Sequence, residues 1–391
     1  MTDAIANLSR GFTALLCAML LSAAASAQLS SENFEFKQIS SGTNRPGVSL
    51  DDLTRDIVLI VNAGNTLADL AGTGSHDVAD IEERAAALAE EGLLRERSDG
   101  SFALAFPVMT LAETPESMPV PSTLIDNSVA LITAHLPEVR TGYAQLAGFE
   151  HVAFEESSLL ILSNVLLDNW QINGIEADIL GTERPARGGG NYYLALMEKS
   201  GPEEEAFGIY GNHFTMLDGL AVGLYGNRRY SGPANIINLP DAETLAARLG
   251  TDADVAPAAV RQRLAETLHA LHRDSGHEAV AGEITLLREF GLIDEDNRVL
   301  IPVFGMAVYE ALSEMANAFR PELAALLQAH LPELQTHYER SPYAANGVSF
   351  EEYFIWWYHL YYSRVTDALA ESGEIRIPAT VNTTYLGVLT E

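Results

Sequence analysis

The chain contains very little cysteine and lysine, and both shortages exclude common chemistries. Its single cysteine is Cys17, and its only lysines are Lys37 and Lys199. With no cysteine after the N-terminal segment, we expect no disulfide, thiol nucleophile or cysteine-ligated zinc site. The scarcity of lysine argues against Schiff-base chemistry and phosphate-binding P-loops, both of which need a lysine. Because dinucleotide, EF-hand and GxSxG motifs are also missing, the sequence predicts no cofactor.

Positive charge is scarce as well. The chain has 23 Lys and Arg against 54 Asp and Glu, a formal net charge of −31. A nucleic-acid binder must neutralise phosphates, and a strongly negative field opposes that approach. We therefore expect no nucleic-acid partner. After the first segment, no stretch is long and apolar enough to predict a membrane span.

Residues 1–27 have the pattern of a secretory signal peptide. Arg10 precedes an apolar run over 12–21, and Ala25-Ser26-Ala27 is a cleavage site of the small-x-small kind. The run is too short to cross a bilayer. The pattern predicts a periplasmic or secreted protein, with an uncleaved membrane anchor as the alternative.

An internal repeat is the most specific signal. Segment 134–143 recurs 195 residues later as 329–338, and Pro107 recurs as Pro302 at the same offset. Several matches in one order predict a tandem duplication.

The duplication divides the chain into five parts. Two glycine-rich segments between the copies, together with 192–197, predict an antiparallel meander. The expected parts are a signal peptide at 1–27, a linker at 28–48, repeat A at 49–200, a β-meander insert at 201–241 and repeat B at 242–391.

Each copy opens with two helices and a hairpin. In repeat A the apolar spacing predicts helices over 51–70 and 76–91, then a hairpin over 93–106 that turns at Asp99-Gly100. In repeat B the helices are expected over 257–274 and 278–290, before a shorter hairpin. This order resembles the bacterial winged-helix proteins of the ArsR and MarR kind.

That resemblance implies DNA recognition through the second helix of each unit. Here those helices, 79–91 and 282–289, are both net acidic. The departure falls on the part that would contact DNA, which argues against a transcriptional regulator.

Long helices are expected to follow each hairpin, and each copy then ends on a strand. The predicted ranges are 121–146, 154–180, 307–338 and 350–372. The fold class is therefore α+β and mostly helical, with two tandem winged-helix-like units, long helices and a small antiparallel sheet.

Two of these helices are apolar on every side. Segment 159–167 is aliphatic and 353–362 is aromatic, which predicts that both are buried. Alternatively, the aromatic helix lines a ligand pocket, with Trp357 and His359 among its contacts.

A second candidate site follows the aliphatic helix. Asp168, Asn169 and Trp170 are clustered there, and Arg187 precedes the run Gly188-Gly189-Gly190, whose backbone N–H groups can form an anion-binding nest. A solvated helix end is the alternative interpretation.

The remaining candidates are weaker. His269, His272 and His277 form the only histidine cluster, a weak candidate for a metal site, and a partly exposed helix face followed by a turn residue is the preferred explanation. The pairs Glu155-Glu156 and Glu351-Glu352 can serve acid–base chemistry, but first-turn glutamates also complement the helix dipole.

These observations favour an exported interaction or ligand-binding protein whose partner is an unknown protein or small molecule. An enzyme is less favoured. The alternatives are a periplasmic hydrolase that uses histidine and glutamate in a cleft between the repeats, and a winged-helix regulator.

We expect the mature protein to begin at Gln28, because cleavage follows the small-x-small site. N-terminal sequencing of the protein from its native host tests this. Recovery from the cytosol with an intact Met1 contradicts the prediction of export.

Overall fold

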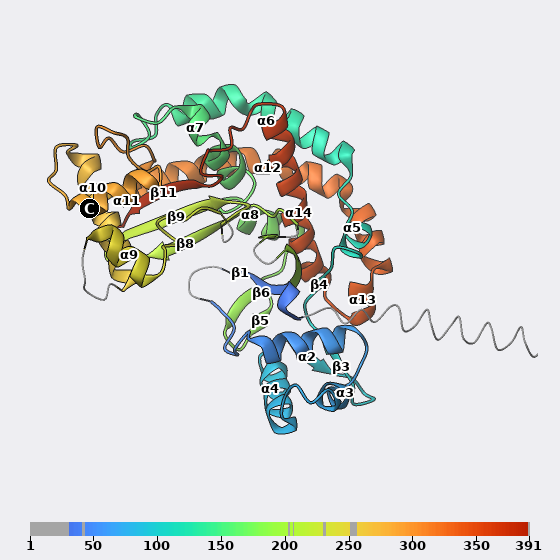
Figure 1. Cartoon of the computed structure of the whole chain (residues 1–391). Coiled ribbons are helices and arrows are strands. Elements are labelled where there is room, and N and C mark those ends of the chain that lie inside the picture. Colours follow the sequence, from blue (N-terminus) through green and yellow to red (C-terminus); the bar gives the residue numbers. More distant parts are fainter. Residues whose placement is uncertain are drawn as a thin grey trace, which may run out of the picture.

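A computed structural model describes residues 31–40, 44–201, 204–205, 207–229, 232–250 and 256–389. The expected signal peptide lies outside the described residues. The protein is α+β and mostly helical, with small sheets. Figure 1 shows two helical groups, one at the left and one at the bottom of the molecule, with strands between them and long helices along the top and right. Among the described residues, no helix has the length and apolar character needed to cross a bilayer.

The first half begins with a 3-10 turn and a strand that the sequence does not predict. These elements are η1 (Ser31–Asn33) and β1 (Phe34–Ser40). They are followed by α2 (Asp52–Asn62), α3 (Leu67–Gly72), α4 (Val78–Glu90) and the hairpin strands β2 (Leu94–Glu96) and β3 (Phe102–Leu104).

The single helix expected over 51–70 is wrong. Helix α2 begins after Asp51, whose carboxylate accepts from the Thr54 N–H, and it ends at Asn62. Gly64 then adopts a φ of 76°, a conformation that glycine takes at little cost. Thr66 starts α3 with a capping box. The turn and the new cap break the helix.

The long elements of the first half come next. They are β4 (Val108–Met109), α5 (Thr114–Ser117), α6 (Ser122–Tyr143), α7 (Phe154–Ser158), the π-helix η2 (Leu159–Val165), α8 (Ile172–Ile179), β5 (Ala186–Arg187) and β6 (Gly190–Gly201). The expected helix over 154–180 is therefore three segments. Its middle is a π-helix, a rare form that is frequent at functional sites.

The second half contains more strands and the longest helix. Its elements are β7 (Glu204–Glu205), β8 (Gly211–Met216), β9 (Leu220–Gly226), α9 (Ala242–Leu249), α10 (Pro257–Arg273), α11 (Ala281–Glu289), β10 (Val303–Gly305), α12 (Met306–Arg340), α13 (Pro342–Asn346), α14 (Phe350–Glu371) and β11 (Thr383–Val388).

The strands form two main sheets and one hairpin. The first sheet has the order β1-β6-β4, with β5 and β7 also paired to β6, and the second has the order β10-β11-β9-β8. Two expectations are corrected here. Residues 28–48 are not simply a linker, because β1 pairs antiparallel with β6. The expected meander is also wrong, because 192–197 lies in β6, in the other sheet from β8 and β9.

Pro107 and Pro302, and likewise Tyr143 and Tyr338, are aligned by the sequence repeat and make matching contacts. The Leu196 N–H donates to Pro107 O at 3.1 Å, and the Leu386 N–H donates to Pro302 O at 3.0 Å. Strand β4 pairs parallel with β6, as β10 does with β11. The Tyr143 hydroxyl donates to Val152 O, and the Tyr338 hydroxyl donates to Val348 O, both at 2.7 Å. The duplication and the winged-helix resemblance remain predictions, and these paired contacts support the duplication.

The buried apolar side chains of the described residues fall into three clusters. One lies around α2 and α4, and one lies around α10, α11 and the second sheet. The largest combines η2 and α14 with α6 and α12, and so joins the two halves.

The aromatic segment 353–362 of α14 is buried on every side, as its sequence predicts. Trp357 is 1% exposed, its indole N–H donates to Pro119 O at 2.9 Å, and its ring stacks on Tyr361 with centroids 5.5 Å apart. The Tyr358 hydroxyl donates to Leu167 O at 2.6 Å. These contacts fix α14 in the shared core.

Replacing Trp357 by alanine should therefore lower the free energy of unfolding by about 3–5 kcal/mol, since it removes a buried aromatic ring and leaves a void. Chemical denaturation measures the change. Phe214→Ala is the control, because Phe214 is 41% exposed. A loss at Trp357 no larger than at Phe214 contradicts the core assignment.

Candidate functional site: a cavity between the sheets

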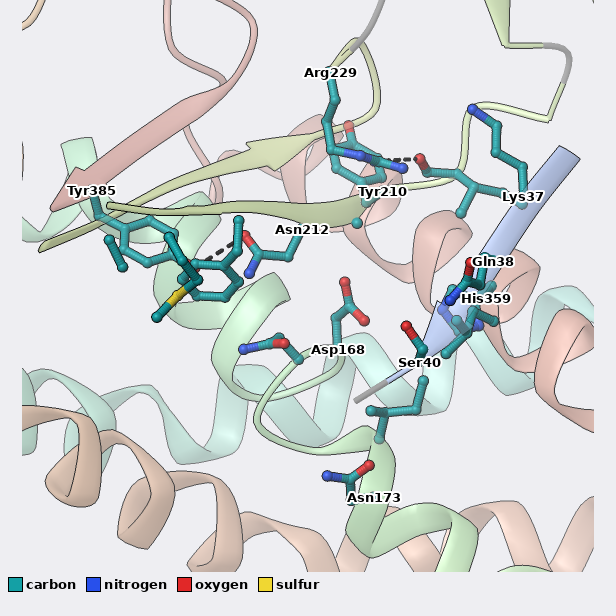
Figure 2. A pocket seen from close by; sticks show the side chains of 18 of the residues that line it. Lys37, Gln38, Ser40, Asp168, Asn173, Tyr210, Asn212, Arg229, His359 and Tyr385 are labelled. Atoms are coloured by element: carbon teal, nitrogen blue, oxygen red, sulfur yellow. Dashed lines mark hydrogen bonds between the residues drawn. The ribbon is translucent and has the colours of Figure 1, made fainter. Parts of the chain in front are cut away.

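A cavity of about 1160 Å³ is lined by residues from both main sheets. Pockets for small molecules are commonly about 300–1,000 Å³, so this one is large enough for a sizeable ligand. Figure 2 shows Tyr385 at one end, Lys37, Gln38 and His359 at the other, and Asp168 between them.

Asp168 is placed by the turn that follows the π-helix. Its backbone N–H donates to Ser163 O at 3.0 Å, five residues earlier, so the wider spacing of η2 continues as far as Asp168. The side chain lines the cavity and is 5% exposed. Its Oδ2 atom is buried and has no hydrogen-bond partner among the described residues. Burying a carboxylate oxygen without a hydrogen-bond partner costs stability, which indicates that the atom serves a function other than folding.

Burial raises the pKa of Asp168 to about 7. The positive charge of Arg229 and the nearby Tyr362 hydroxyl act in the opposite direction. The pKa values of Tyr225, Tyr358 and Tyr362, the phenols around it, are raised well above 10 by burial. Asp168 is therefore the group of this cluster that changes charge near neutral pH.

His359 lies in the middle of α14 and also lines the cavity. Its Nδ1 lies 2.7 Å from Ile355 O. A carbonyl oxygen can only accept, so Nδ1 carries the proton and Nε2 is an acceptor. Burial lowers the pKa of His359 to about 4, helped by the charges of Arg184 and Arg229 and opposed by the Ile355 hydrogen bond. The imidazole is therefore neutral at pH 7.

The cations of the cavity wall already hold other groups. Arg229 donates to the carbonyl oxygens of Ile209, at 3.1 Å, and of Gly226. Arg184 contacts the Glu176 carboxylate at 2.9 Å. The Lys37 ammonium lies 2.9 Å from Glu35. The wall is therefore close to balanced in charge.

Aromatic rings form the other end of the cavity. Tyr385 stacks on Phe304 with centroids 5.7 Å apart, and Phe214 meets it edge-on at 5.6 Å. The Tyr385 hydroxyl contacts Asn212 Oδ1 at 3.0 Å, as Figure 2 shows. Such an end suits an apolar or aromatic part of a ligand.

The six predicted ligand-binding residues do not form one site. Asp168, Asn169 and His359 line the cavity. Trp170 packs against Tyr309, a lining residue, with ring centroids 5.2 Å apart. Trp357 belongs to the shared core described above.

Arg187 lies elsewhere, buried against a partner from the other half. It donates to the Glu352 carboxylate at 2.8 Å. Burial raises the pKa of Glu352 to about 7, and Arg187 and the Leu194 N–H oppose this. The helix-dipole explanation of Glu352 is therefore incomplete, since its carboxylate is buried in an ion pair.

The predicted glycine nest holds a carboxylate of the protein itself. The Gly189 N–H donates to Glu91 Oε1 at 2.8 Å, and the Gly47 N–H does so at 3.2 Å. The Tyr192 hydroxyl donates to the same oxygen at 2.6 Å. The anion that this turn binds is therefore Glu91.

The histidine cluster does not gather ligands. Within the part of the chain that the structure describes, no three His, Cys, Asp or Glu side chains are arranged to hold a metal ion. The His272 ring lies 5.2 Å from the ring of His151. Burial is the main cause that lowers the pKa values of His269 and His272.

Sequence reasoning missed several cavity residues. Arg229 follows a Gly-Asn segment that carries no charge signal, and Lys37 and Gln38 lie on the unpredicted strand β1. The repeated Gly-Asn segments were the one usable hint, since Asn212 and Gly226 contact Tyr385 and Arg229.

Comparisons with known proteins return no relative: no family model, no curated protein and no solved structure matches the chain. The function must therefore be inferred from the cavity itself.

Replacing Asp168 by asparagine should change how stability depends on pH. The folded pKa of about 7 exceeds the ordinary 3.8, so folding favours the protonated acid. The parent's free energy of unfolding should then fall between about pH 4 and pH 7, by up to about 4 kcal/mol at about 1.4 kcal/mol per unit. Asp168→Asn removes this loss and should gain stability over the parent as pH rises.

Urea unfolding of both proteins at about pH 5 and about pH 8 measures the difference. Asp126→Asn, at an exposed position, controls for the loss of one negative charge. A stability difference between Asp168→Asn and the parent that stays constant with pH contradicts the assignment.

Proposed function

We propose that the protein is an exported binding protein that holds a small molecule in the cavity between its two sheets. The observation that carries this proposal is the buried Asp168 Oδ2, which has no hydrogen-bond partner among the described residues and belongs to a side chain of the cavity wall. A protein gains nothing in stability from a buried polar atom left unsatisfied. A ligand that donates a hydrogen bond would satisfy it.

The proposal excludes DNA as the partner. The exposed face of α4 carries Asp80, Glu82 and Glu83, and the whole chain has a net charge of −31. Phosphates would meet repulsion there. We infer that the two helix-and-hairpin units serve as packing modules, consistent with the separate apolar cores around α4 and α11.

A hydrolase is the second candidate, favoured by one observation. Asp168 and His359 line the same cavity, and an acid–base pair needs both to reach one substrate. Binding is the better supported function, because His359 donates to the Ile355 carbonyl rather than to an orienting carboxylate, and with a pKa of about 4 it is a weak base.

Uptake of the apolar fluorophore N-phenyl-1-naphthylamine tests the cavity. The parent should bind it with saturable fluorescence enhancement. Met306→Trp places an indole at a 49% exposed position on the cavity wall, and it should weaken binding by about tenfold. Leu300→Trp is the matched control, because Leu300 is 48% exposed and is not part of the cavity lining.

Failure of the parent to bind the probe, or equal weakening by both tryptophans, contradicts the proposed function. Turnover of an ester or glycoside substrate that is lost in both Asp168→Asn and His359→Gln would instead favour the hydrolase.

A further inference from the structure

The mouth of the cavity gathers exposed apolar side chains. Of the ten large hydrophobic residues that are exposed in the described part of the chain, five line this one cavity. They are Phe214, Met216, Met306, Tyr309 and Leu389. Exposed apolar residues scattered singly need no explanation, but a group of them around a cavity marks a binding surface.

The polar groups lie away from that mouth. Figure 2 shows Gln38 and His359 at the end opposite Tyr385, with Asp168 between the two ends. Tyr385 contacts Phe304 and Phe214 of the apolar end. The cavity is thus divided into an apolar end and a polar end. A ligand that fits both ends has a polar head and an apolar tail.

The hydrogen-bonding capacity of the polar end identifies the kind of head group. When Asp168 is ionised, its Oδ2 is an acceptor without a partner among the described residues, and His359 Nε2 is a second acceptor. Near Asp168 and His359, Arg229 donates to two backbone carbonyls and Arg184 donates to the Glu176 carboxylate. Asn212 Nδ2, a lining donor without a partner among the described residues, belongs to a side chain that contacts Tyr385 at the other end. The polar end therefore offers acceptors to a ligand, and a head group that donates hydrogen bonds fits it.

Charge narrows the choice among donors. A hydroxyl group brings one hydrogen and no charge, whereas a primary ammonium brings three hydrogens and a positive charge. The net charge of −31 draws cations toward the protein and repels anions. A desolvated carboxylate also forms its strongest hydrogen bonds with a charged donor.

Resting on the proposed binding function, we propose that the cavity binds an amphiphile with a primary ammonium head. The ammonium donates to the Asp168 carboxylate, and His359 Nε2 accepts from the same head group or from a neighbouring hydroxyl. The tail lies between Phe214, Met306 and Tyr309, where its burial from water adds to the affinity.

Competition against bound N-phenyl-1-naphthylamine tests this assignment with three ligands of one chain length: octylamine, octanol and octanoate. The parent should release the probe at octylamine concentrations at least about tenfold below those of octanol, because hydrogen bonds to charged groups are worth more than neutral ones. Octanoate should compete least.

Asp168→Asn should remove the preference for octylamine over octanol and leave octanol itself within about threefold of its parent value, because the tail contacts are unchanged. Asp126→Asn is the control for lost charge and should retain the preference. Probe binding by Asp168→Asn shows that its cavity is intact.

The outcomes separate the two proposals. If the parent does not bind the probe, the binding function itself is wrong. If it binds the probe but octanol or octanoate competes as well as octylamine, or if Asp168→Asn keeps the preference for the amine, the ammonium assignment is overturned and the cavity remains.

Discussion

Burial of two helices that are apolar on every side is the constraint on which the rest of the structure depends. Neither the π-helix η2 nor the aromatic segment 353–362 of α14 has a face suited to water, so each must be covered by protein on all sides. They meet where Ser163 Oγ lies 2.6 Å from Thr366 Oγ1 and where the Tyr358 hydroxyl reaches Leu167 O. The helices α6 and α12 complete the cover. The shared core therefore draws on both halves of the chain.

Two ion pairs also join the two halves of the chain. Glu352, at the start of α14, accepts from Arg187 and from the Leu194 N–H. Glu156, the aligned residue of the first half, contacts Arg376 near the end of the second. The first pair is buried and the second is exposed. Because a lone buried charge is costly, each member of the Arg187–Glu352 pair requires the other.

Much of the fold could be predicted from periodicity, because helices and the hairpin are set by local spacing and turn residues. Helices α6, α12 and α14 lie within a few residues of their predicted ranges. Strand β1 could not be predicted, since its partner β6 lies more than a hundred residues away. The π-helix has no local signal either, because its aliphatic residues suit an α-helix equally well.

The candidate site was predictable only in part, and for a related reason. The sequence predicts Asp168 as a site residue because it is a polar residue directly after an apolar run. The sequence does not show that Arg187 belongs to a different place, because only the structure reveals its partner Glu352. On an all-aromatic helix, the sequence does not say which face meets a cavity. Trp356 and His359, three residues apart, share the cavity face, whereas Trp357 and Tyr361 stack on another. The predicted tryptophan was therefore the neighbour of the one that lines the cavity.

The two helices also explain why the cavity has a polar end at all. The apolar sequence of η2 ends shortly after the helix does, and the position that follows holds Asp168 instead of an apolar residue that would extend the core. Burial of this carboxyl raises its pKa, so ionising it at neutral pH lowers the free energy of unfolding. An asparagine would avoid that cost within the same space. Function is expected at positions where a residue costs the fold stability. In this protein that residue is Asp168, and it lines a cavity whose mouth is apolar.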